Sequence, residues 1–215
     1  MKIYGFSGLG ADKRVFKYLS LKHQLVPIEW IEPKESESIE QYSIRLSKVI
    51  NKEEKFGILG VSFGGLIAVE ISKVLNPEVT ILISTAETKN DLRPIFKIVG
   101  ILGILKLFPA KFFDPPRFLA KWVFGTKNNG KLLDEILDDT DLDFAKWAIN
   151  ELANWKNINK LQNRVLKIGG TNDKLMPIGN QKSTIKILKG EHFMIIENAK
   201  EISKIINEKT LYNNR

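Results

Sequence analysis

The stretch that decides the fold is ILGVSFGGLIAVEI, residues 58–71, in which one serine stands between two different hydrophobic patterns. Before the serine, the apolar run FGILGV (56–61) has the length and composition of a buried strand. After it, GGLIAVEISKVL (64–75) is apolar on most sides, which is typical of a helix in the centre of a protein. Glycines crowd around Ser62 on both sides, so the sequence predicts a tight strand-to-helix turn there.

The alternation of apolar runs with helix-length segments extends over most of the chain. Strands are predicted at residues 2–6, 24–30, 56–61, 79–85, 164–170 and 183–190. Helices are predicted around Val15, Phe16 and Leu19, from Ser38 onward, at 64–75 and at 193–212. Such alternation implies right-handed crossovers. The predicted fold class is α/β, with a mostly parallel sheet of about six strands covered by helices on both faces.

Two local signals refine these elements. Pro27 lies inside the second apolar run, and a proline there predicts an irregular strand or an edge strand. Ser38 and Gln41 have the spacing of a capping box, which predicts that a helix begins after Ser38.

Between residues 87 and 158 the strand-helix alternation stops. This stretch contains Trp122, Trp147, Trp155 and most of the phenylalanines, in helix-length apolar patterns broken by prolines and Gly130. We interpret residues 87–158 as a helical lid insertion within a single domain that spans residues 1–215.

Composition limits the function without fixing it. The 215 residues are 43% apolar, enough for one sizeable core, and they carry a net charge of +8. That charge can indicate nucleic acid, a membrane or an acidic partner, or simply a Lys-, Asn- and Ile-rich background. Because there is no cysteine, disulfides, thiolate metal sites and cysteine nucleophiles are excluded.

Two further absences bear on location and partners. MKIYGFSGLGADKR at the N-terminus lacks a signal-peptide core, and the longest uncharged apolar run, Ile98–Leu105, has 8 residues. We therefore expect a cytoplasmic protein without a transmembrane segment. No nucleic-acid-binding motif accompanies the positive charge, so we expect no nucleic-acid partner.

The turn at Ser62 has the spacing of a nucleophile. GVSFG, residues 60–64, matches G-x-S-x-G, in which the turn projects a serine hydroxyl at the carboxyl ends of the strands. The alternative is a Gly-rich turn of a nucleotide-binding fold. Neither G-x-G-x-x-G nor G-K-[ST] follows, which argues against that alternative.

A serine nucleophile needs a base and a carboxylate. His192 directly follows a predicted strand and opens the last helix, so it is the candidate base, whereas His23 lies in a polar connection and is expected to be solvated. Asp173 follows the strand at 164–170 and gives the chain order Ser62, Asp173, His192. Glu87 is the fallback acid. For the oxyanion hole we expect the backbone N–H groups of Phe63 and Leu9.

These pieces, FSGLGADKRVF (6–16), GVSFGG (60–65), GGTNDKLMP (169–177) and GEHF (190–193), together resemble the α/β-hydrolase superfamily over essentially the whole chain. The chain looks like its small single-domain serine hydrolases, whose helical lid would occupy residues 87–158. Two departures stand out. Ser7-Gly8 replaces the His-Gly of many relatives, which we expect to affect substrate orientation. The two leading antiparallel strands of larger members are expected to be absent.

The resemblance implies acyl transfer to water, with an ester or thioester substrate and without a cofactor or metal. Other members are carbon–carbon bond hydrolases or cofactor-free haloperoxidases, and some hydrolase-like folds only bind ligands, so these alternatives stay open. A serine at the elbow argues against haloalkane dehalogenases and epoxide hydrolases, which carry aspartate there.

The predicted lid has an uneven charge. Residues 92–133 carry eight basic side chains and one acid, Asp114, whereas residues 134–143 carry six acids and no base. The basic residues are Arg93, Lys97, Lys106, Lys111, Arg117, Lys121, Lys127 and Lys131, interleaved with Phe96, Ile101, Leu105, Phe108, Phe112, Phe113 and Phe118. This pattern suits an anionic acyl carrier or a lipid surface. The alternative is that the charges are solvated or pair with the acidic stretch.

Overall fold

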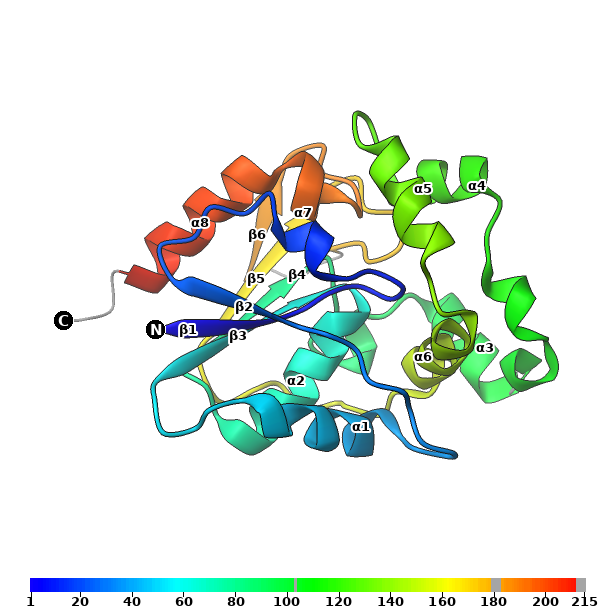
Figure 1. Ribbon diagram of the computed structural model, residues 1–215, viewed down its shortest axis with the longest axis horizontal. Helices are drawn as coiled ribbons and strands as arrows, with labels where there is room; N and C mark the ends of the chain where they lie inside the picture. The colour runs from blue at the N-terminus through cyan, green and yellow to red at the C-terminus, as the bar shows by residue number, and fades with distance from the viewer. Residues whose placement is uncertain (103, 179–182, 212–215) are drawn as a thin grey trace.

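One parallel sheet forms the centre of the molecule. The computed structural model describes residues 1–102, 104–178 and 183–211 (Figure 1). Its strands are β1 (Lys2–Phe6), β2 (Gln24–Ile28), β3 (Phe56–Val61), β4 (Val79–Ile83), β5 (Val165–Gly170) and β6 (Thr184–Ile187). Within the described residues these six strands lie in the order β2-β1-β3-β4-β5-β6, and every neighbouring pair is parallel. The predicted parallel sheet of about six strands is confirmed.

The strand order reverses between β1 and β3. From β1 the chain moves to β2 on one side and then returns to place β3 on the other side. Phe6 at the end of β1 stands beside Gly60 near the end of β3. In open parallel sheets, ligands bind at such a reversal, outside the carboxyl ends of the strands. The predicted nucleophile follows β3 at this point.

Helices cover both faces of the sheet, as predicted. Figure 1 shows α1 and α2 on one side of the sheet and α7, α8 and η1 on the other. The helices are α1 (Ile39–Leu46), α2 (Phe63–Leu75), α3 (Pro94–Leu102), α4 (Arg117–Phe124), α5 (Gly130–Asp138), α6 (Leu142–Asn154), α7 (Met194–Glu197) and α8 (Ala199–Leu211). Short 3-10 turns occur at η1 (Lys13–Phe16), η2 (Ser47–Val49), η3 (Lys89–Asp91), η4 (Ile104–Leu107) and η5 (Ala110–Phe113).

Two hydrophobic cores follow from the alternation of side chains along the strands. Ile58 faces the core beneath α1 and α2, where Tyr42 and Leu66 are also buried. Leu59, the next residue, faces the opposite core, which it shares with Ile202 of α8. Because both faces are covered, β3 is buried at every position, which explains its continuous apolar run.

The local signals are confirmed, with some differences in extent. Ser38 caps α1 in a capping box with Gln41, and β2, which contains Pro27, is an edge strand. The predicted helix around Val15 is a single 3-10 turn. The predicted closing helix is two helices, because the carbonyl of Asn198 accepts the first hydrogen bond of α8 and so starts a new helix. Tyr212, the last residue of that prediction, lies outside the described residues.

The stretch between β4 and β5, here called the β4–β5 segment (residues 84–164), contains α3 to α6. Figure 1 shows these helices at the end of the molecule away from the start of β1 and the end of α8. The predicted interruption of the strand pattern is therefore helical, while its role as a lid and the domain boundaries 1–215 and 87–158 stay predictions. None of the described helices is long and apolar enough to cross a lipid bilayer.

Candidate active site

Ser62 occupies a strained turn between β3 and α2. Its φ is 52° and its ψ is −121°, a conformation that non-glycine residues rarely adopt. A Cβ on Gly60 would lie 2.4 Å from the Gly64 carbonyl oxygen, and one on Gly64 would lie 2.1 Å from the Ser7 carbonyl oxygen. Both flanking positions therefore require glycine, as the G-x-S-x-G spacing predicts.

The turn is held from the neighbouring strand. The backbone N–H of Ser62 donates to the Ile83 carbonyl at 3.0 Å, and the Thr85 hydroxyl donates to the Ser62 carbonyl at 2.6 Å. A Cβ on Gly65 would lie 2.2 Å from the Thr85 side chain, so glycine at position 65 leaves room for that side chain. Sequence reasoning missed Thr85, and its only signal was its place at the end of a predicted strand.

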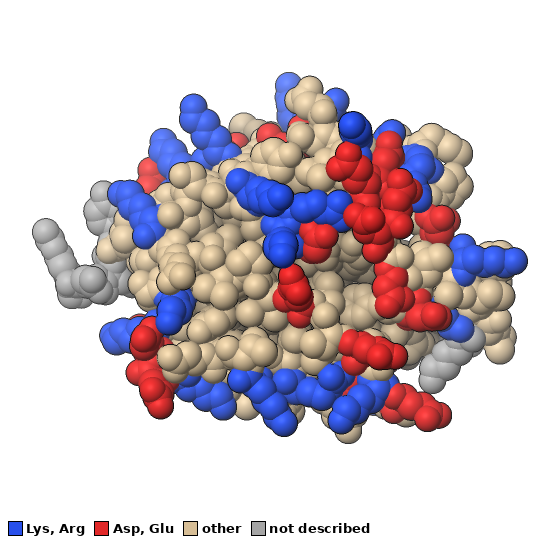
Figure 2. Space-filling model, in the orientation of Figure 1, with Lys and Arg blue, Asp and Glu red and all other residues tan. Residues whose placement is uncertain are grey.

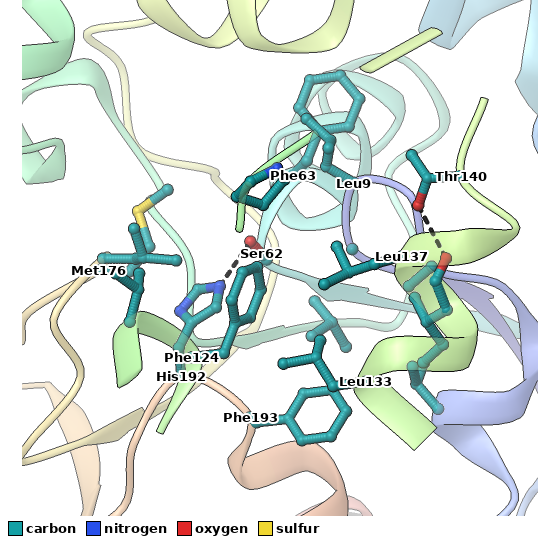
Figure 3. Close-up of a pocket in the computed structure, with 18 of the residues that line it drawn as sticks. Leu9, Ser62, Phe63, Phe124, Leu133, Leu137, Thr140, Met176, His192 and Phe193 are labelled. Atoms are coloured by element: carbon teal, nitrogen blue, oxygen red, sulfur yellow. Dashed lines mark hydrogen bonds between the residues drawn. The ribbon is translucent and has the colours of Figure 1, made fainter. Parts of the chain in front are cut away.

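The structure brings Ser62, His192 and Asp173 together. Nε2 of His192 lies 2.9 Å from Oγ of Ser62 (Figure 3). Nδ1 of His192 lies 2.9 and 3.0 Å from the two carboxylate oxygens of Asp173. A proton on Nδ1 satisfies both contacts, because Nδ1–H then donates to Asp173 and Nε2 accepts from Ser62. His192 is 4% exposed and Asp173 is 5% exposed, so the chain of hydrogen bonds is largely shielded from water.

The surroundings of Asp173 favour its ionised form. Burial raises its pKa, but electrostatic attraction to His192 and hydrogen bonds from His192, Met176 and Leu175 outweigh burial and hold the pKa of Asp173 below its ordinary value. The two backbone N–H groups donate to Oδ1 at 2.8 and 2.9 Å. Asp173 is thus a carboxylate that can orient the imidazole and stabilise its positive charge.

The loops that carry Asp173 and His192 support each other. The N–H of Thr171 donates to the Ile187 carbonyl at 3.0 Å, and the N–H of Asn172 donates to the Gly190 carbonyl at 2.9 Å. A Cβ on Gly170 would lie 2.3 Å from that same carbonyl oxygen, so glycine allows the two backbones to approach. The ends of β5 and β6 therefore fix the distance between the carboxylate and the imidazole.

Leu9 and Phe63 both line the cavity beside Ser62. Phe63 begins α2, and the first N–H groups of a helix have no acceptor within the helix. The turn before Leu9 lies close as well, since a Cβ on Gly8 would be 3.5 Å from Cβ of Ser62. The hydroxyl of Ser7, which we expected to affect the substrate, donates instead to the Ala11 carbonyl at 2.7 Å and closes this turn.

The two alternative residues lie away from the site. Glu87 is buried in an ion pair with Lys167 at 3.3 Å and accepts the N–H of Leu161, so Asp173 is the carboxylate beside His192. The prediction that His23 is solvated is wrong. It is half-buried against Thr210 of α8, its Nε2 has no hydrogen-bond partner among the described residues, and burial lowers its pKa.

A cavity of about 270 Å³ opens at Ser62 (Figure 3). Leu9, Met176 and Phe193 line its inner side, and the β4–β5 segment supplies much of its wall. The segment's contributions are Phe96, Phe113, Pro115, Val123, Phe124, Leu133, Ile136, Leu137, Thr140, Ile149 and Leu152. Besides Ser62 and His192, the polar side chain among the described lining residues is Thr140, whose hydroxyl contacts the Ile136 and Gly10 carbonyls at 2.8 and 3.2 Å. The cavity therefore suits an uncharged, apolar group.

The basic stretch of the β4–β5 segment is partly neutralised by acids. Arg117 pairs with Asp138 and Lys121 pairs with Asp134, each at 2.6 Å. Figure 2 shows acidic side chains gathered where Figure 1 places α5 and α6. The side chains of Lys97, Ile101 and Lys106 lie outside the described part of the chain. Among the described residues, no group of three or more His, Cys, Asp or Glu could hold a metal ion.

Comparison with known proteins places this architecture. No protein-family model and no curated protein shows a significant match to the sequence. Solved structures do match. A hydrolase from Oleispira antarctica, olei00960, has a TM-score of 0.71 at 14% identity, over 99% of this chain and 91% of that one. A lipase-esterase related protein from Clostridium acetobutylicum has a TM-score of 0.68 at 17% identity, over 96% and 93%.

A thermophilic esterase from Thermogutta terrifontis, solved with malate bound, has a TM-score of 0.67 at 14% identity, over 97% of this chain and 89% of that one. The parallel sheet, the serine turn and these likenesses define the fold class as α/β. In particular, the chain has the α/β-hydrolase fold, as the sequence motifs predicted.

Proposed function

We propose that this protein is a serine hydrolase that cleaves carboxylic esters or thioesters through an acyl-enzyme on Ser62. The observation that carries the proposal is the continuous hydrogen-bonded chain from Ser62 through His192 to Asp173, located at an apolar cavity. A hydroxyl, an imidazole and a carboxylate in this order are the groups that nucleophilic acyl transfer requires.

In the acylation step, His192 accepts the Ser62 proton while Oγ attacks the carbonyl carbon of the substrate. The ionised Asp173 stabilises the resulting imidazolium. His192 then donates that proton to the leaving alcohol or thiol as the carbonyl re-forms. In deacylation, His192 removes a proton from water as the water oxygen attacks the acyl carbon. His192 then donates that proton to Oγ of Ser62 as the acyl–oxygen bond breaks, which releases the acid and restores the Ser62 hydroxyl.

The tetrahedral oxyanion needs donors on the side of the carbonyl opposite His192. In the proposal these are the backbone N–H groups of Phe63 and Leu9. The position of Phe63 at the start of α2 supports this role, because its N–H lies at the positive end of the helix dipole. Ser7 acts indirectly, since its hydroxyl holds the turn that carries Leu9.

The cavity supports a particular kind of acyl group. A cavity of 150 Å³ accommodates benzene, so about 270 Å³ leaves room for a ring with a short chain or for an alkyl chain of moderate length. Its described wall contains no lysine or arginine to pair with a carboxylate or phosphate. An uncharged apolar acyl group is therefore proposed, with any charged part of the substrate outside the cavity.

The site fits other chemistries of this fold less well. A carbon–carbon bond hydrolase or a haloperoxidase can use the same three residues, but the esterase and lipase-esterase names among the structural neighbours favour ester cleavage. A ligand-binding protein needs no strained serine hydrogen-bonded to a histidine, and this strain argues for catalysis.

A fluorophosphonate probe tests the proposal directly. It should label one serine in the wild-type protein, none in Ser62→Ala and little in His192→Ala. Both substitutions should lower ester turnover by about a thousandfold or more. A series of p-nitrophenyl esters from acetate to palmitate, with acyl-CoA thioesters beside it, identifies the acyl group. A folded wild-type protein that is not labelled would overturn the proposal, and labelling without turnover of any acyl substrate would favour the alternatives.

A further inference from the structure

The β4–β5 segment exposes an unusual set of large apolar side chains. Between 41% and 82% of each is accessible to solvent. We call this set the apolar patch, and it consists of Leu107, Phe108, Phe112, Phe118, Leu119 and Trp122. All six lie in one short stretch of chain that includes η5 and α4, at the end of the molecule away from the start of β1 (Figure 1).

Two pairs of side chains within the apolar patch are adjacent. The rings of Phe108 and Phe112 are 5.5 Å apart. Phe118 and Trp122 are four residues apart on α4, so they project from the same face of that helix. Contiguous apolar surfaces are uncommon on soluble monomers and usually mark an interaction site.

The apolar patch is the outer side of the cavity wall. Phe112 is 64% exposed, whereas its neighbour Phe113 lines the cavity. Trp122 is likewise 63% exposed, and the next residues, Val123 and Phe124, line the cavity. A thin wall therefore separates the apolar surface outside from the apolar space beside Ser62.

Positive charge accompanies the apolar patch. Lys111 is exposed next to Phe112 and makes no ion pair with any described residue. Lys131, in the first turn of α5, is 92% exposed, and its contact with Glu135 is long at 3.8 Å. A surface that combines exposed aromatic side chains with exposed lysines is typical of proteins that lie on anionic membranes, with rings among the acyl chains and ammonium groups among the phosphates.

We infer that the apolar patch docks the protein on an anionic phospholipid surface. Leu107 and Phe118 are 82% and 77% exposed, so they project into solvent, as side chains that enter a lipid layer must, and do not line a groove for another protein. Trp122 adds an amphipathic ring suited to the lipid–water boundary. One consequence rests on the proposed function: an apolar ester can pass from the lipid to Ser62 across a short distance.

The test is flotation with vesicles of phosphatidylcholine and phosphatidylglycerol in equal parts, performed on the wild type and on Ser62→Ala. Both should float with the vesicles, because docking does not need the nucleophile. The triple variant Leu107→Ser, Phe112→Ser, Phe118→Ser should lose about a hundredfold in partition. A matched control, Ile44→Ser, Val49→Ser, Val74→Ser, removes apolar side chains that are 49%, 59% and 57% exposed on other elements and should bind like the wild type.

Two measurements separate docking from misfolding and from self-association. The triple variant should hydrolyse a water-soluble ester at the wild-type rate, since none of its three positions lines the cavity. Vesicles with brominated acyl chains should quench the fluorescence of Trp122, and this quenching should be lost in Trp122→Phe. Equal flotation of the triple variant and the wild type would overturn the inference. The inference would also be overturned if the wild type did not bind vesicles and instead formed a dimer that dissociates in the triple variant. Equally tight binding to phosphatidylcholine alone would overturn the preference for negative charge.

Discussion

The two halves of the molecule differ in how much large apolar surface they expose. Around the sheet, large apolar side chains such as Phe6, Leu59 and Phe63 are fully buried, and backbone atoms approach so closely that only glycine fits. In the β4–β5 segment, residues such as Phe112 and Trp122 are mostly exposed. The sheet half holds three polar side chains within hydrogen-bonding distance, whereas the segment forms much of the wall of the cavity.

This difference separates two physical tasks. Nucleophilic chemistry needs groups placed to within a fraction of an ångström, which a close-packed sheet provides. Substrate entry needs a surface that meets the substrate's own environment, and exposed helices can provide one at little cost to the core. Substitutions in the sheet half should therefore affect turnover or folding, and substitutions in the segment should affect what is bound.

The largest effect is expected for Asp173→Asn. The amide can no longer act as an acceptor with full negative charge, and it favours the histidine tautomer with its proton on Nε2, which cannot accept a proton from Ser62. We expect kcat to fall by about a thousandfold to ten-thousandfold. The free energy of unfolding should change by no more than about 2 kcal/mol. Steady-state kinetics with a p-nitrophenyl ester measures the change.

Glu87→Gln is the matched control, because Glu87 is an equally buried carboxylate that pairs with Lys167 instead of His192. Its loss should lower the free energy of unfolding by about 1–3 kcal/mol, since Asp91 still pairs with Lys167 at 3.4 Å. The folded variant should keep kcat within a few-fold of wild type. If Glu87→Gln were the slower enzyme, the assignment of Asp173 would be wrong.

Gly64→Ala should give the next largest effect, this time on stability. The new Cβ would lie 2.1 Å from the Ser7 carbonyl oxygen and 2.4 Å from that of Phe6, and neither backbone atom can move freely inside the sheet. We expect the free energy of unfolding to fall by about 3 kcal/mol or more, as measured by urea denaturation.

Gly130→Ala makes the same change in the β4–β5 segment. There the nearest atom to a new Cβ would be Cε of Lys121 at 3.4 Å, the end of a flexible side chain. The variant should be within about 0.5–1 kcal/mol of wild type, and a helix-favouring gain is the expected direction. Equal losses for the two glycines would remove the proposed contrast between the halves.

The features that the sequence predicted lie mostly in the sheet half. The turn at Ser62, the order Ser62, Asp173, His192 and helix α2 depend on spacing along the chain and on simple burial patterns, so they were predictable. Gly60 and Gly64 were also informative, because a position where two backbones approach closely admits few residues other than glycine.

What the sequence did not predict depends on contacts between distant segments. Thr85 supports the serine turn through a hydrogen bond across two strands, and His23 is half-buried because α8 returns to cover it. The shape of the cavity depends on several helices, each with some apolar side chains that line the cavity and others that face solvent. Phe113 lines the cavity and its neighbour Phe112 faces solvent, and no periodicity in the sequence distinguishes the two.

An effect smaller than that of Gly64→Ala is expected at a link between the two halves. Oε1 of Glu197 in α7 accepts the backbone N–H groups of Lys127, Asn128 and Asn129 at 3.0, 3.0 and 3.1 Å, and so attaches the turn before α5 to the sheet half. Burial raises the pKa of Glu197, but these N–H groups outweigh burial and hold the pKa below its ordinary value. Glu197→Gln keeps an acceptor but loses its charge, and should cost about 1 kcal/mol near neutral pH.

The sign of the pH dependence makes this small effect testable. A carboxyl group whose folded-state pKa is lowered stabilises the fold above its unfolded pKa, and that stabilisation is lost as pH falls through the folded-state pKa. The difference in unfolding free energy between wild type and Glu197→Gln should therefore shrink as the solution is acidified below the ordinary glutamate pKa of 4.5. Glu208→Gln, on an exposed position of α8, should show little difference at any pH. A Glu197→Gln deficit that stayed constant into acid would mean that packing, and not the carboxylate charge, joins the β4–β5 segment to the sheet half.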